Sequence, residues 1–124
     1  MKFIITCICS VFLLSNITFA KGDLAIRAKK LELKLGSEKS DYEMSQKVFE
    51  LETGKAYRLE ISSMGFKEYE FEAEDFFRNV WIRNIEVEGI EIDTSIINEI
   101  EFEREGEIEN KFVPIRPGKY EFEI

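Results

Sequence analysis

The sequence predicts an all-β protein folded as an antiparallel β-sandwich. Apolar and charged residues alternate with a period of two along several runs, as in residues 67–72 and 120–124, where aromatic side chains alternate with glutamates. The runs follow one another at about ten-residue spacing, which is typical of a sandwich rather than of βαβ units. Single glycines separate them, where turns require positive φ: Gly54, Gly65, Gly89 and Gly106.

The alternation places each element in turn. Strands are expected at residues 24–35, 48–52, 56–62, 67–72, 80–87, 90–93, 99–103, 108–113 and 120–124. Residues 36–46 are polar and irregular, and residues 73–79 suit a short helical turn. Aromatic side chains are expected to fill the core, each burying on the order of 150–250 Å²: Phe49, Tyr57, Tyr69, Phe71, Phe76, Phe77, Trp81, Phe102, Phe112, Tyr120 and Phe122.

Glutamates occupy the outward positions of these strands. We expect them to form a solvated face rather than a docking patch. Like charges that lie directly opposite each other on neighbouring strands destabilise a sheet. The sequence therefore predicts that lysine and arginine are interleaved with the glutamates, or that the glutamates lie at sheet edges.

The N-terminus has the layout of a cleavable signal peptide. Lys2 gives a short positive region, residues 3–20 contain no charged side chain, and the run ends on the small residue Ala20, before Lys21. We expect cleavage near Ala20, which divides the chain into a signal peptide (1–20) and one domain (21–124) that works in the periplasm or outside the cell. A retained membrane anchor is the alternative, because about 17 residues is the lower limit for spanning the hydrocarbon core.

Cleavage leaves an acidic domain with a narrow range of chemical groups. Cys7 and Cys9 depart with the signal peptide, so no disulfide framework can form in the mature domain. The chain also has no histidine. Loss of Lys2 leaves 16 basic residues against 25 acidic ones, a net charge of −9. This charge argues against binding to nucleic acid or anionic lipid, which both need clustered lysine and arginine. It suits a basic exported protein as partner, although solubility explains it equally well.

We do not expect an enzyme. The common nucleophile–base pairs need histidine or cysteine, and the Glu-x-Glu pairs follow strand alternation rather than an acid–base arrangement. A hard-cation site is the remaining alternative. Glu72, Glu74 and Asp75, or Glu91 and Asp93, offer oxygen ligands to Ca²⁺, without the ordered ligand spacing of a calcium loop.

The C-terminal end resembles the cupredoxins. Residues 112–122 match the pattern F-x-x-x-x-P-G-x-Y-x-[FY], in which a strand, a Pro-Gly corner and a second strand lead into the copper loop of that family. Residues 77–81 and a hairpin at 51–62 resemble small periplasmic members, so that the resemblance covers about residues 46–124. It implies a Greek-key antiparallel sandwich, and its motif residues are Phe112, Pro114, Pro117, Gly118, Tyr120 and Phe122.

The resemblance also implies that the copper site of the family has been lost. A type 1 site uses two imidazoles, a thiolate and usually a thioether. The family pattern puts the thiolate six residues after Gly118, where this chain has Ile124. Met44 and Met64 are the only sulfur-containing residues of the mature domain. We therefore expect no metal and no cofactor, although the family itself implies copper.

The cupredoxin strand that follows the ligand loop has no counterpart after Ile124. Residues 120–124 would then lie on an exposed sheet edge, which is a template for pairing with another chain. Three interpretations stand equally: a second copy or a partner strand pairs there, the domain has fewer strands, or the chain is truncated relative to its relatives.

Two functions remain open. We favour an exported, non-catalytic binding or accessory protein on a cupredoxin-like scaffold that has lost its copper ligands. The alternative is a periplasmic copper-binding or electron-transfer protein in keeping with the family. The metal content of the purified protein separates the two.

Overall fold

The computed structural model describes residues 27–124, and the predicted signal peptide and its cleavage point lie outside this range. Seven strands and one helical turn follow one another along the chain. They are β1 (Lys29–Leu35), β2 (Tyr57–Ser63), β3 (Tyr69–Glu72), α1 (Glu74–Phe77), β4 (Val80–Val87), β5 (Ile90–Ile92), β6 (Glu99–Phe102) and β7 (Gly106–Pro114). Within residues 27–124, no helix is long and apolar enough to cross a membrane.

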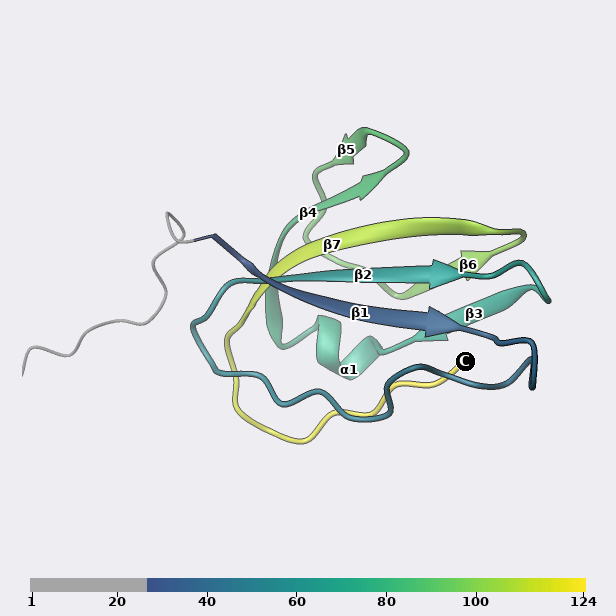
Figure 1. Ribbon diagram of the computed structural model, residues 1–124. Coiled ribbons are helices and arrows are strands. Elements are labelled where there is room, and N and C mark those ends of the chain that lie inside the picture. The colour runs from purple at the N-terminus through teal and green to yellow at the C-terminus, as the bar shows by residue number, and fades with distance from the viewer. Residues whose placement is uncertain (1–26) are drawn as a thin grey trace, which may run out of the picture.

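The strands form two sheets (Figure 1). The larger sheet has the order β1-β2-β7-β4-β5, and β3 pairs with β6 in a two-stranded sheet. The mostly β architecture predicted from the alternation is confirmed, but the expectation of a purely antiparallel arrangement is wrong. β1 and β2 are parallel, with Lys29 opposite Tyr57. The long connection through residues 36–56 returns the chain to the start of β1, so that β2 runs in the same direction.

Most predicted elements are present. The prediction of β4 agrees with its observed bounds, and α1 lies within the predicted helical turn. Two predicted strands are absent: residues 48–52 form none, and residues 120–124 make only an isolated bridge between Glu123 and Glu72. In both segments alternate side chains are half-buried, as Phe49 and Phe122 are. Alternating apolar and polar residues show that one face of a segment is buried. A β-strand also needs a neighbouring segment with which its backbone forms hydrogen bonds.

Three of the four predicted turn glycines have positive φ: 83° at Gly54, 79° at Gly65 and 78° at Gly89. Gly106 does not, and it opens β7 instead.

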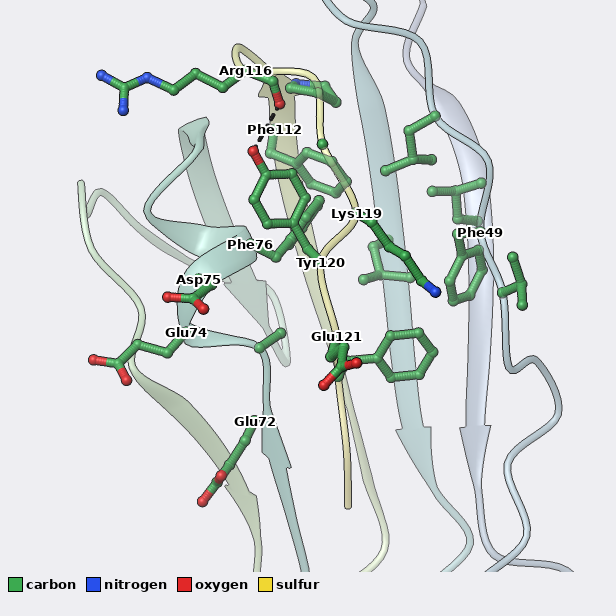
Figure 2. Close-up of a pocket in the computed structure, with 18 of the residues that line it drawn as sticks. Phe49, Glu72, Glu74, Asp75, Phe76, Phe112, Arg116, Lys119, Tyr120 and Glu121 are labelled. Carbon is green, nitrogen blue, oxygen red and sulfur yellow. Dashed lines mark hydrogen bonds between the residues drawn. The ribbon is translucent and has the colours of Figure 1, made fainter.

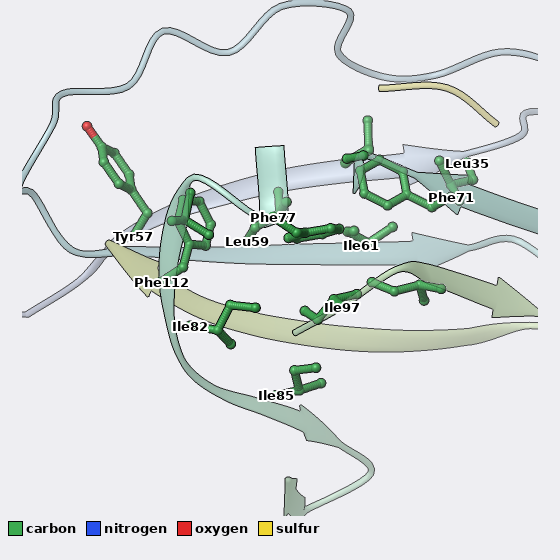
Figure 3. Close-up of a cluster of buried hydrophobic side chains, with 14 of the residues drawn as sticks. Leu35, Tyr57, Leu59, Ile61, Phe71, Phe77, Ile82, Ile85, Ile97 and Phe112 are labelled. Carbon is green, nitrogen blue, oxygen red and sulfur yellow. The ribbon is translucent and has the colours of Figure 1, made fainter. Parts of the chain in front are cut away.

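The core lies between the two sheets (Figure 3). Six predicted core aromatics are buried, and four more are half-buried and pack around them. Trp81 is the exception, since it is 44% exposed. Its neighbours in β4, Val80 and Ile82, are buried, so that Trp81 points to the opposite face of the sheet.

One polar side chain lies wholly inside this core. Asn110, in β7, is 0% exposed, and neither amide atom of its side chain has a hydrogen-bond partner within the described chain. A buried amide without a partner lowers stability by about 1–3 kcal/mol. We therefore expect Asn110→Leu, which keeps the number of side-chain heavy atoms, to raise the free energy of unfolding by about 1–2 kcal/mol in urea titrations.

Asn98→Leu is the control for this substitution, because Asn98 is exposed. It is expected to change the free energy of unfolding by less than about 0.5 kcal/mol. A loss of stability in Asn110→Leu alone would contradict the prediction, because the amide would then be making a favourable interaction.

Candidate binding surface

The outward side of the β3–β6 sheet carries only carboxylates. Antiparallel pairing places Glu70 opposite Glu101 and Glu72 opposite Glu99, and Glu123 bridges to Glu72 on the far side of β3. All five are exposed, and none forms an ion pair within residues 27–124. We call these five residues the acidic face. Lysine and arginine are not interleaved here. The glutamates instead meet the other predicted alternative, because β3 and β6 form a two-stranded sheet and both are edge strands. Each directly opposed pair destabilises the sheet.

The outward side of the larger sheet is built differently. Basic residues alternate with glutamates along its four longest strands. Like charges still face each other between strands, as Glu60 faces Glu109, but diagonal ion pairs link neighbouring strands: Lys30 with Glu60 at 3.0 Å, Arg58 with Glu109 at 3.5 Å, and Lys111 with Glu86 at 3.5 Å. The expected interleaving is confirmed on this sheet. The two sheets therefore differ in whether their opposed glutamates also have basic partners, and not in whether like charges face each other.

Three carboxylates of the acidic face converge. Oxygens of Glu70, Glu72 and Glu99 all lie within 4.8 Å of one another. A hydrogen bond with Glu99, followed by the charges of Glu99 and Glu72, raises the pKa of Glu70 above its ordinary value. The folded protein thus holds a proton at Glu70 more readily than the unfolded chain does.

This raised pKa makes stability depend on pH. Where the folded pKa exceeds the unfolded one, the stabilisation is complete below the unfolded pKa and is lost as the pH rises through the folded pKa. We expect Glu70→Gln to have a higher Tm than the wild type at about pH 7, and the difference to vanish below about pH 4. Differential scanning fluorimetry across this range measures it.

Glu38→Gln removes the same charge from an exposed site outside the acidic face. It should follow the wild-type profile. An equal or lower Tm for Glu70→Gln at about pH 7 would show that the carboxylates do not repel one another in the folded state.

The predicted cation ligands are divided by the fold. Glu72 joins Glu70 and Glu99, whereas Glu74 forms an ion pair with Arg78 one turn along α1. The only group of three convergent carboxylates found within the described chain is therefore the exposed one on β3 and β6. The sequence could not identify it, because it depends on the register between two strands about thirty residues apart.

A groove of about 970 Å³ borders the acidic face. Its floor is aromatic, with Phe49, Phe76, Tyr120 and Phe122 half-buried in it. The Tyr120 ring packs edge-on against Phe76 with centroids 6.1 Å apart, and its hydroxyl donates a 3.0 Å hydrogen bond to the Arg116 carbonyl (Figure 2). Phe122 lies between the Phe49 and Phe71 rings, at 5.9 and 5.8 Å.

The walls of the groove carry charges of both signs. Acidic side chains come from the end of β3, from α1 and from the last four residues: Glu72, Glu74, Asp75, Glu121 and Glu123. Basic side chains come from Lys47, Arg116 and Lys119. Figure 2 shows Glu72, Glu74 and Asp75 along the β3–α1 wall, with Lys119 on the other side of the C-terminal segment.

The residues of the predicted cupredoxin-like motif lie along this groove. Phe112 and Pro114 are buried at the end of β7, Pro117 and Gly118 form an exposed corner, and Tyr120 and Phe122 form part of the floor. A Cβ atom on Gly118 would lie 3.1 Å from the Tyr120 ring. Glycine at the corner thus admits the ring, which gives the Pro-Gly-x-Tyr sequence a packing role.

The donor atoms present do not fit a type 1 copper site. Ile124, at the family's thiolate position, offers no ligand atom and packs half-buried against the core. Met44 and Met64 both approach Leu35, Met44 through a β-bridge and Met64 through a 3.3 Å backbone hydrogen bond. The chain has no histidine, and its two cysteines lie outside the described residues. Within residues 27–124, soft ligands are therefore limited to two thioethers.

Comparisons with known proteins do not assign the chain to a family. No protein-family model matches it, and neither a curated protein nor a solved structure is significantly similar to it.

Proposed function

We propose that the protein is an exported, non-catalytic binding or accessory protein that docks a basic region of another exported protein. The observation that supports this most directly is the pairing of an aromatic groove with adjacent carboxylates that have no basic partner in the described chain. On the larger sheet Glu60, Glu86 and Glu109 each have a basic partner, so the same chain does pair glutamates with lysine and arginine elsewhere. A basic partner would relieve the repulsion that the acidic face carries alone.

If docking is electrostatic, replacing glutamates of the acidic face with glutamine should weaken the binding of a basic ligand and so locate the binding site. A decalysine peptide serves as the probe, with affinity measured by isothermal titration calorimetry in low and high salt. Removing three charges from the acidic face, as Glu70→Gln/Glu99→Gln/Glu101→Gln, is expected to weaken binding at least about fivefold at low salt, with the effect shrinking as salt screens the charges.

The matched control is Glu38→Gln/Glu91→Gln/Glu105→Gln, which changes the net charge equally at exposed sites elsewhere. It should weaken binding less than about twofold. Equal losses in the two triple variants, or no binding of decalysine by the wild type, would refute the proposal.

The cupredoxin-like scaffold, the absence of a cofactor and the export of the protein are parts of the same proposal. Titration of the purified domain with Cu(I) and Cu(II) should reveal no intense thiolate-to-copper absorption. Expression in a secreting bacterial host should give a mature chain that begins at Lys21. A blue, copper-loaded protein would overturn the first expectation, and an uncleaved chain the second.

A further inference from the structure

The C-terminal segment that forms one side of the groove, residues 117–124, has unused backbone hydrogen-bonding capacity. Its backbone is tied to the rest of the described chain by two hydrogen bonds, both between Glu123 and Glu72 and both 3.0 Å long. Residues 117–122 make no backbone–backbone hydrogen bond within residues 27–124. Their side chains alternate, with Tyr120 and Phe122 turned inward and Glu121 outward. The segment thus has the form of a strand with most of its pairing groups free.

A second extended segment has the same property. Residues 46–51 also make no backbone–backbone hydrogen bond within the described chain. The Phe49 ring packs on Phe122 with centroids 5.9 Å apart, so this segment covers one side of the C-terminal segment and leaves the groove on the side of Phe76 and Asp75 (Figure 2). A groove of this kind suits an extended polypeptide, which forms main-chain hydrogen bonds with the edge and places alternate side chains on the floor.

The charged side chains that line the groove favour a polypeptide with a positive net charge. Five carboxylates and three basic side chains line the groove, and of these only Glu74 has an ion-pair partner within residues 27–124. Three further glutamates of the acidic face, Glu70, Glu99 and Glu101, adjoin the carboxylate side with no base between them. The potential at this end of the molecule is therefore negative, and aromatic rings on the floor also attract cations.

We propose that the groove binds an extended segment of a partner protein in which lysine or arginine alternates with apolar residues. This deepens the proposed function and rests on it: the acidic face attracts a basic partner, and the groove recognises its extended, alternating segment. Apolar side chains pack on Phe76, Tyr120 and Phe122, while the basic ones face Asp75 and Glu121.

Three capped synthetic octapeptides test the proposal on the full chain: alternating Lys-Val, alternating Lys-Gly and alternating Glu-Val. The Lys-Val peptide is expected to bind at least about tenfold more tightly than the Lys-Gly peptide of equal charge, because only the former has apolar side chains for the floor. Chemical-shift changes in NMR spectra should be largest at Phe76, Tyr120 and Phe122.

Two double variants locate the site. Asp75→Asn/Glu121→Gln removes groove charges and is expected to weaken Lys-Val binding about tenfold, and Glu99→Gln/Glu101→Gln, outside the groove, only about twofold to threefold. Equal affinity for the Lys-Val and Lys-Gly peptides, or tighter binding of Glu-Val, would overturn this inference. If both lysine peptides bind and the Glu99/Glu101 variant loses most, the proposed function stands and the groove is wrong. If neither binds, both proposals fail.

Discussion

Gly36→Ala is expected to lower the free energy of unfolding by about 2–5 kcal/mol, because two separate penalties combine there. Gly36 has a φ of 81°, in the left-handed region that disfavours a side chain. A Cβ atom would also lie 2.1 Å from the Tyr69 hydroxyl oxygen and 3.0 Å from Cζ of the same ring. Tyr69 is 5% exposed, so the ring cannot swing into solvent to make room.

Gly89→Ala separates the two penalties. Gly89 has a φ of 78°, but nothing lies within 4 Å of the Cβ position, so alanine there meets the backbone strain alone. We expect it to lower the free energy of unfolding by about 1–2 kcal/mol. Chemical denaturation of both variants measures the difference, which is the steric part.

Tyr69→Phe should recover part of that steric loss. The hydroxyl of Tyr69 is buried without a hydrogen-bond partner in the described chain, so removing it alone should change stability little. The double variant Gly36→Ala/Tyr69→Phe is expected to be more stable than Gly36→Ala, because the closest contact is gone. If Gly36→Ala lowers the free energy of unfolding no more than Gly89→Ala does, the Tyr69 ring does not restrict the space at Gly36.

The sequence predicts where the strands of this fold lie along the chain better than it predicts which strands pair with each other. Alternation located β2, β3, β4 and β7 within a few residues, because a sheet with one face on a core requires that period. Applied to β4, the same rule places Trp81 outward, because Val80 and Ile82 on either side of it are buried, and the prediction of Trp81 as a core residue is wrong. Element type is a local property, and alternation records it.

Pairing is not local, and the candidate site depends on pairing. The acidic face exists because Glu70 meets Glu101 and Glu72 meets Glu99. A register shift of two residues would keep every glutamate on the same side and change each pair. Similarly, nothing in the sequence distinguishes Glu60 of β2 and Glu109 of β7, which have basic partners, from the glutamates of β3, which have none within the described chain. The aromatic floor was predicted as core, since burial and groove lining require the same residue types.

Phe112→Ala is the second substitution with a large expected effect, a loss of about 3–5 kcal/mol in the free energy of unfolding. Phe112 is 1% exposed, and its ring packs against Tyr57 at 5.9 Å and against Phe76 at 5.3 Å, almost perpendicular to the latter. It thereby joins β7 and β2 to α1. Removing the ring would leave a cavity that these neighbours cannot fill without moving.

Val113→Ala is the matched control, since Val113 follows in β7 but is only half-buried on the outward side of the sheet. It should cost less than about 1 kcal/mol. The loss of stability in Phe112→Leu should lie between those of Phe112→Ala and Val113→Ala, because leucine retains much of the apolar volume.

The Phe112→Ala variant also tests the packing of the C-terminal motif. Because Phe76 is held between Phe112 and Tyr120, a cavity at Phe112 is expected to loosen the groove floor and broaden the NMR signals of Tyr120, even where the protein remains folded. Sharp, unshifted Tyr120 signals in a folded Phe112→Ala protein would show that the floor does not depend on β7, and that the motif residues do not act as one packed unit.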